Sequence, residues 1–150
     1  MLKEGMIAPE FTLPNEKGEE ISLSNFRGKK VVLYFYSKDN TPGCTRQACA
    51  YAGAYALFEE KNAVVIGVSK DSATSHEKFA AKHGLPFLLL ADPEKEVHSL
   101  YGVLKEKTMY GKKTIGTERT TFLINEEGVL VRVRKKVNPD TDPAEVLALL

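Results

Sequence analysis

The chain lacks several features that would point directly to a role. Its 150 residues hold 21 lysines and arginines against 20 aspartates and glutamates, so the net charge is only +1. This balance provides no field that would attract nucleic acid or an acidic membrane surface. The N-terminus opens no long apolar segment, so we expect neither a signal peptide nor a membrane helix. There is also no repeat, low-complexity tract or linker, and we expect one cytoplasmic domain spanning residues 1–150.

Cysteine is scarce as well, with only Cys44 and Cys49 in the chain. Two cysteines are too few for a metal-binding module. His76 and His83 stand seven residues apart, about 10.5 Å along a helix, which is too far to chelate an ion together. We interpret both, and His98, as helix-surface side chains. Cysteines of a cytoplasmic protein are kept reduced. Two cysteines alone in such a chain are therefore more typical of catalysis than of a structural disulfide.

The two cysteines lie in a segment that follows a hydrophobic run at residues 31–36. A run of β-branched and aromatic residues closed by turn formers predicts a buried strand. The composition after Gly43 predicts a helix to about Lys61, with Cys44 in its first turn. Unpaired N–H groups and the helix dipole at that position favour a thiolate. The pattern therefore predicts that Cys44 reacts, the alternative being a small buried apolar residue.

The spacing of the two cysteines predicts a pair that bonds only after a rearrangement. Positions i and i+5 of a helix have Cα atoms about 8.6 Å apart and point about 140° away from each other. A disulfide needs its Cα atoms within about 7 Å. Cys44 and Cys49 therefore cannot bond while the helix is intact, although its first turns could unwind to join them.

The rest of the chain alternates between strand and helix patterns. Predicted strands lie at residues 11–13 and 20–23 (an N-terminal hairpin), 31–36, 63–69, 87–90, 120–124 and 129–133. Predicted helices follow Gly43, begin at Ser72 or Thr74 and stop at Gly84, span 97–101, and start at Asp142-Pro143. Residues 103–118 are expected to be a loop or an irregular strand. This order predicts an α/β protein with a central mixed sheet flanked by helices on both faces, the thioredoxin-like layout with an added N-terminal β-hairpin.

Several motifs, taken in order, resemble a known family. They are Thr41-Pro42-Gly43-Cys44-Thr45 with Cys49, Ser75-His76, Leu85-Pro86-Phe87, Asp92-Pro93, Tyr101-Gly102 and Arg119-Thr120-Thr121-Phe122-Leu123-Ile124. Together they resemble the peroxiredoxins of the bacterioferritin-comigratory (Q) type, from about Gly5 to Val146. The resemblance implies a cytoplasmic thiol peroxidase that reduces hydrogen peroxide and organic hydroperoxides in antioxidant defence.

The chain departs from the family pattern beside the reactive cysteine. The family carries a proline four residues before the motif threonine, where this chain has Ser37. That proline helps to shield the cysteine from solvent and shapes the pocket, so the rate or substrate preference of this chain is expected to differ. Gln47 stands where a glutamate is common, and Ala52-Gly53 where Arg-Asp is common.

The resemblance assigns the reaction to named residues. Cys44 is the peroxidatic nucleophile, whose thiolate attacks a peroxide oxygen and becomes a sulfenic acid. Thr41 is expected to hydrogen-bond the peroxide or the thiolate, or to cap the helix. The N–H groups of Gly43 and Cys44 can polarise the peroxide, while Pro42, which has no N–H, fixes the loop.

The same resemblance implies a cation and a second thiol. Arg119 supplies a positive charge that lowers the thiol pKa and orients the peroxide, with Arg46 as the fallback. Cys49 is the resolving thiol, which condenses with the sulfenic acid to an intramolecular disulfide. Thioredoxin or a similar dithiol then restores the reduced state.

No metal, flavin or haem is needed for this chemistry, and we expect no membrane or nucleic-acid partner. A resolving cysteine in the same chain favours a monomer, with a weak dimer as the alternative. Two competing functions stay open at this point. One is a thiol-disulfide oxidoreductase, whose usual C-x-x-C spacing is absent, and the other is a non-enzymatic interaction domain that kept the fold.

Overall fold

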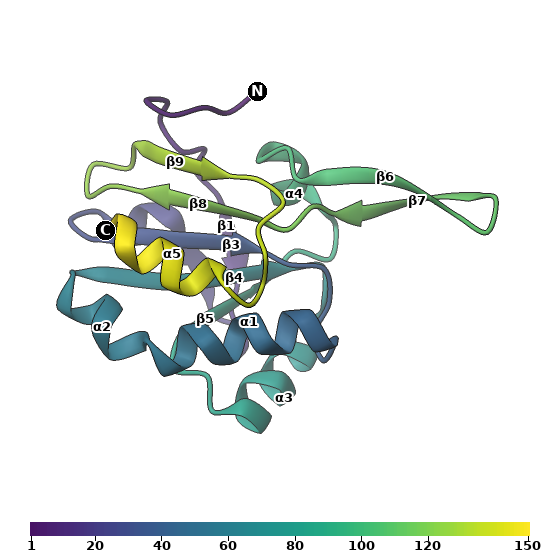
Figure 1. Cartoon of the computed structure of the whole chain (residues 1–150), viewed down its shortest axis with the longest axis horizontal. Coiled ribbons are helices and arrows are strands. Elements are labelled where there is room, and N and C mark those ends of the chain that lie inside the picture. Colours follow the sequence, from purple (N-terminus) through teal and green to yellow (C-terminus); the bar gives the residue numbers. More distant parts are fainter.

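A five-stranded mixed sheet forms the centre of the molecule (Figure 1). The computed structural model describes the backbone of residues 1–150 and all side chains except that of Met109. The strand order is β5-β4-β3-β8-β9. The strands are β3 (Lys30–Phe35), β4 (Ala63–Ser69), β5 (Leu88–Ala91), β8 (Thr120–Ile124) and β9 (Leu130–Arg134). β3, β4 and β5 run parallel, whereas β8 is antiparallel to both β3 and β9.

Both faces of this sheet are covered, which explains why its central strands are largely apolar. On one face lie α1 (Pro42–Gly53), α2 (Tyr55–Glu60), α3 (Ala73–His83) and α5 (Asp142–Leu149), over side chains that include Val32, Tyr34 and Tyr36. The other face is covered by the N-terminal hairpin of β1 (Thr12–Pro14) and β2 (Glu20–Ser22), by the 3₁₀-helix η1 (Leu23–Phe26) and by α4 (Glu96–Leu100). The predicted mixed sheet with helices on both faces is confirmed.

The register of the sheet gathers three loops at one edge. Phe35, the last residue of β3, pairs with Val68 near the end of the parallel β4 and with Thr120 at the start of the antiparallel β8. The loop that enters α1, the loop after β4 and Arg119 therefore meet at the same end of these strands. Arg119, 75 positions from Cys44 in the sequence, becomes a neighbour of Cys44 in this way.

The helix predicted from Cys44 to about Lys61 is present but interrupted. It begins two residues earlier, at Pro42, and α1 ends at Gly53. Ala54 leaves the helical conformation, with φ −100° and ψ 4°, before α2 resumes at Tyr55. Glycine has a low helix propensity, so the break falls where the helix is weakest. None of the helices in the described chain has both the length and the apolar character to cross a membrane.

Residues 103–118, expected to form a loop or an irregular strand, instead form a regular hairpin. β6 (Leu104–Met109) pairs with β7 (Lys112–Thr117), and the ribbon projects from the body of the molecule (Figure 1). Tyr110 and Gly111 at its tip both have positive φ, 53° and 76°, as a two-residue hairpin turn of type I′ requires. Most side chains of this hairpin are exposed, so its sequence contains no apolar run that would predict strands.

Candidate active site

Cys44 lies in the first turn of α1, as predicted. Thr41 is the N-cap, with an extended backbone, and Pro42 fills the first helical position, where its missing N–H costs nothing. The Cys44 side chain is only 1% exposed and faces the sheet, whereas Cys49 is exposed on another side of the helix. Both are free thiols. The helix thus keeps the two sulfurs apart, as its geometry requires.

Polar groups from two segments, the loop before α1 and the residue before β8, surround the Cys44 sulfur. The Arg119 guanidinium donates from Nη2 to Sγ at 3.3 Å, and the Ser37 hydroxyl lies 3.5 Å from Sγ. Burial acts to raise the pKa of the thiol. Hydrogen bonds from the backbone of Lys38 and from the side chains of Ser37 and Thr41, together with the Arg119 charge, outweigh burial and lower the pKa of Cys44 below its usual value. The site favours the thiolate.

Thr41 is tied to its own loop rather than to the helix. Its side chain makes no cap hydrogen bond to α1, and its hydroxyl donates to the carbonyl oxygen of Lys38 at 2.7 Å. The hydroxyl also contributes to the lowered pKa of Cys44. A hydroxyl has one proton, so at any moment Thr41 donates a single hydrogen bond, either to the Lys38 carbonyl or to another acceptor. The structure thus places the Thr41 hydroxyl on the Lys38 carbonyl, among the groups that favour the thiolate.

Arg119 is held in place by Gln47, one turn after Cys44 in α1. Its Nη1 donates to the Gln47 side-chain oxygen at 2.7 Å. Gln47 is fully buried and donates in turn to Asp142 at 3.2 Å. The guanidinium thus contacts Gln47 through Nη1 and the Cys44 sulfur through Nη2. Arg46, the fallback cation, pairs instead with Asp140 at 2.7 Å on the exposed side of the helix.

The sequence predicts that a helix starts at Asp142, and the structure gives its side chain a further role. Thr141 takes the N-cap position of α5, and Asp142 is fully buried. Its carboxylate accepts hydrogen bonds from Gln47, Tyr51, Thr121 and Arg134. It therefore joins α1, β8, β9 and α5 behind the reactive cysteine. No signal in the sequence distinguished this acid from an ordinary helix-start residue.

The interpretation of the histidines as surface side chains is wrong for two of the three. His76 and His98 are both 0% exposed, and each lies 2.7 Å from a carboxylate, Asp39 and Asp92 respectively. His83 is only half-buried. The spacing held a signal for His76, because it stands three residues before the buried Phe79 and therefore on the same helical face.

Comparisons with known proteins identify the family. The AhpC/TSA family matches residues 5–133. The chain belongs to this family. Peroxiredoxin Bcp of Bacillus subtilis is 47% identical over 146 residues, covering 97% of this chain and 93% of the relative. Within the family the chain is thus a peroxiredoxin of the bacterioferritin-comigratory (Q) type, a thiol-dependent peroxidase that acts on peroxides with thiol reductants.

Solved structures agree with this peroxiredoxin assignment. A mutant of Xylella fastidiosa peroxiredoxin Q superposes with a TM-score of 0.94 at 35% identity, covering 99% of this chain and 95% of the other. The Xanthomonas campestris bacterioferritin comigratory protein, studied for its alkyl peroxide reduction activity, gives a TM-score of 0.92 at 35% identity, covering 98% and 96%. The thioredoxin-like fold predicted for the peroxiredoxin is confirmed.

Proposed function

We propose that the protein reduces hydrogen peroxide and alkyl hydroperoxides with Cys44 as the peroxidatic thiol. The observation that carries the proposal is the Arg119 guanidinium at 3.3 Å from the buried Cys44 sulfur, in a site that lowers the thiol pKa. The Cys44 thiolate attacks one peroxide oxygen, the O–O bond breaks, and an alkoxide or hydroxide leaves and takes up a proton. Cys44 is thereby oxidised to the sulfenic acid and the peroxide is reduced to alcohol or water.

The groups around the sulfur supply the polar contacts that this step needs. The N–H groups of Gly43 and Cys44, in the first turn of α1, have no partner within the helix and can hydrogen-bond a peroxide oxygen. Thr41 and Arg119 approach the same point from the loop and from the start of β8. Pro42 stiffens the backbone that presents these N–H groups, and Ser37 adds a hydroxyl beside the sulfur.

Cys49 completes the cycle as the resolving thiol. It attacks the sulfur of the Cys44 sulfenic acid, water leaves, and a disulfide forms. Because α1 holds the two side chains on different faces, residues between them must unwind first. Thioredoxin or a similar dithiol then reduces the disulfide by exchange. A thiol cycle of this kind suits the cytoplasm, where cysteines are kept reduced, and the resolving thiol in the same chain supports a monomer.

A coupled assay tests the proposal. Purified protein is given hydrogen peroxide or an alkyl hydroperoxide, with thioredoxin, its reductase and NADPH, and the loss of NADPH absorbance is followed. We expect catalytic turnover that depends on both the protein and the dithiol. Absence of peroxide-dependent turnover with every dithiol supplied would contradict the proposal.

Replacing the resolving thiol should separate the two half-reactions. In Cys49→Ser the first peroxide equivalent should react at a rate within about twofold of wild type, because the exposed side chain lies off the site. The sulfenic acid should then persist, with a gain of about 16 Da that dimedone converts to a stable adduct. A Cys49→Ser protein that still forms an intramolecular product with no added oxygen would contradict the role of Cys49.

Ser37 offers a milder test of how the thiolate is stabilised. Ser37→Ala removes a hydrogen bond to Cys44, so we expect the thiol pKa to rise by up to about one unit. The sign follows from the chemistry: only the thiolate reacts, so the rate rises with pH up to the pKa and is flat above it. Below that pKa the variant should react more slowly than wild type, and well above it the two rates should converge. Alkylation rates across the pH range, measured in the Cys49→Ser background, check this.

A further inference from the structure

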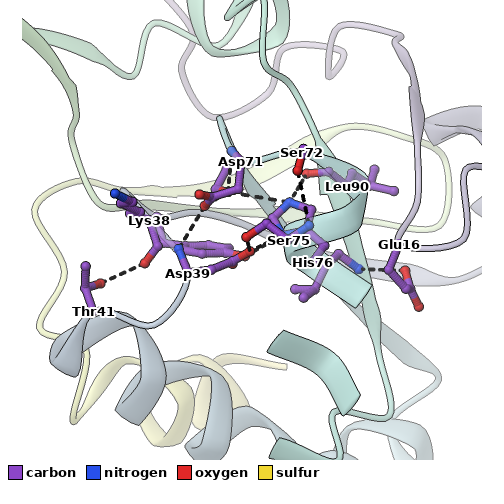
Figure 2. Close-up of polar contacts among 12 residues, drawn as sticks. Glu16, Lys38, Asp39, Thr41, Asp71, Ser72, Ser75, His76 and Leu90 are labelled. Atoms are coloured by element: carbon purple, nitrogen blue, oxygen red, sulfur yellow. Dashed lines mark hydrogen bonds and ion pairs between the residues drawn. The ribbon is translucent and has the colours of Figure 1, made fainter. Parts of the chain in front are cut away.

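The loop that surrounds the Cys44 sulfur is held from behind by one buried residue, Asp39. The residue is 4% exposed and lies in the middle of the loop between β3 and α1 (Figure 2). Its backbone N–H donates to Asp71 at 2.8 Å. One carboxylate oxygen accepts from the Tyr36 hydroxyl at 2.6 Å, and the other accepts from Ser75 at 2.8 Å and from His76 at 2.7 Å.

The loop would not hold its shape by local preference alone. Asn40, directly after Asp39, has φ 66°, in the left-handed region, which is unfavourable for residues other than glycine although asparagine tolerates it better than most. Such a conformation persists only where the surrounding contacts fix it. Asp39 on one side and the bond from Thr41 to the Lys38 carbonyl on the other supply these contacts. The positions of Ser37, the Lys38 backbone and Thr41 relative to the sulfur therefore depend on Asp39.

His76 faces Asp39 as a cation. Its Nε2 lies 3.0 Å from the carbonyl oxygen of Leu90, which only accepts hydrogen bonds, so Nε2 carries a proton. Its Nδ1 faces the Asp39 carboxylate. Burial acts to raise the pKa of that carboxyl, but hydrogen bonds from His76, Tyr36 and Ser75 outweigh burial and lower it. An ionised carboxylate also only accepts, so Nδ1 is protonated too.

The buried pair thus joins α3 to the reactive loop through two full charges. The side chains of His76 and Asp39 are 0% and 1% exposed, so water screens this attraction little. Asp39, Asp71 and His76 offer atoms within 4.8 Å of one another, a grouping that can also hold a metal ion. An imidazolium, however, has no lone pair for a metal, and its Nδ1 proton already points at Asp39.

We propose that His76 is a positioning residue for peroxide reduction: its imidazolium fixes Asp39, and Asp39 fixes the loop that presents Ser37, the Lys38 backbone and Thr41 to Cys44. The proposal rests on the function proposed above, because it concerns the same thiolate. His76 touches neither the sulfur nor the substrate in this arrangement. It acts through the geometry of the groups that stabilise the thiolate and bind the peroxide.

The test replaces His76 by Asn in the Cys49→Ser background, where Cys44 is the only thiol. Asn keeps a donor near the position of Nδ1 but carries no charge and does not reach Leu90. Two rates are measured: alkylation of Cys44 by iodoacetamide from pH 4 to 10, and the reaction with hydrogen peroxide at pH 7. We expect the apparent pKa of Cys44 to rise by about one unit and the peroxide rate to fall by about 10- to 100-fold.

The chain contains a matched control in His98. It is equally buried and its Nδ1 lies at the same 2.7 Å from a carboxylate, that of Asp92, but the pair belongs to α4 on the opposite face of the sheet. His98→Asn should lower the melting temperature without moving either reactivity of Cys44. If His76→Asn and His98→Asn both lower stability while leaving the pKa and the peroxide rate unchanged, the proposal is overturned.

A second variant covers the case in which His76→Asn does not fold. Ser75→Ala removes only one hydrogen bond to Asp39 and leaves the ion pair in place. It should slow the peroxide reaction by about threefold and raise the Cys44 pKa slightly. No change in either quantity would overturn the proposal. Failure of the proposed function looks different: the Cys49→Ser reference itself would then not react with peroxide, although its alkylation profile would still report the effect of His76.

Discussion

Cys44→Ser should abolish peroxide reduction, lowering the rate by at least about 1,000-fold. The hydroxyl of serine has nearly the same shape as the thiol but stays protonated at neutral pH, so no nucleophile forms beside Arg119. The fold should survive, because the side chain is small and buried among α1 and sheet residues. The measurement is peroxide consumption under single-turnover conditions, with circular dichroism to confirm folding.

Cys49→Ser is the natural comparison for this variant. Cys49 is exposed, and among the described residues no side chain makes a hydrogen bond to its sulfur. If Cys44→Ser still consumed peroxide while Cys49→Ser did not, the assignment of the two thiols would be reversed. The geometry argues against that outcome, since the cation, the helix start and the hydroxyls all converge on Cys44.

Arg119→Ala should lower kcat/KM for peroxide by about 100- to 1,000-fold, the usual effect of removing one preorganised donor from a charged transition state. Its guanidinium donates to the sulfur from one nitrogen and to Gln47 from another, so it is both charged and fixed in direction. The variant should also raise the pKa of Cys44. Because Arg119 also donates to the charge that develops during the reaction, a rate deficit should remain at high pH, where the thiolate is fully formed. Stopped-flow rates against pH separate the two effects.

Two further variants define what Arg119 contributes. Arg119→Lys keeps the charge but cannot make both bonds with its single ammonium group, so it should recover only part of the rate. Arg46→Ala removes an exposed cation from α1. Arg46 pairs with Asp140, and both side chains of this pair are more than half exposed. The variant should stay within about twofold of wild type. If Arg119→Ala proved as active as Arg46→Ala, the cation would have no role in the reaction.

The parts of the site that were predictable are those written in local sequence. A strand followed by turn formers, and then by helical composition after Gly43, places Cys44 in the first turn of α1, and the structure agrees. The same motif, through its family resemblance, singled out Arg119. The sheet register explains why Arg119 lies beside Cys44, since Thr120 pairs with the last residue of β3. A distant residue could be named only because the family pattern carried it.

The parts that were missed depend on contacts between distant segments. Gln47 meets Asp142 across 95 positions, and Asp39 meets His76 across 37. In the sequence, an acid before a proline is an ordinary helix start, and a histidine on a helix is an ordinary surface residue. Nothing local shows that Asp142 is buried, and for His76 the one local signal is its position three residues before Phe79. The β6–β7 ribbon was missed for a different reason, because a polar exposed hairpin has no hydrophobic alternation to display.

The central claim is that Cys44 takes the oxygen from peroxide and Cys49 resolves it. Free-thiol titration with intact mass, after one equivalent of hydrogen peroxide, tests it most directly on wild type, Cys44→Ser and Cys49→Ser. The wild type should lose both thiols and about 2 Da within seconds, Cys44→Ser should keep its single thiol, and Cys49→Ser should gain about 16 Da. A wild type that keeps both thiols for hours would contradict the account.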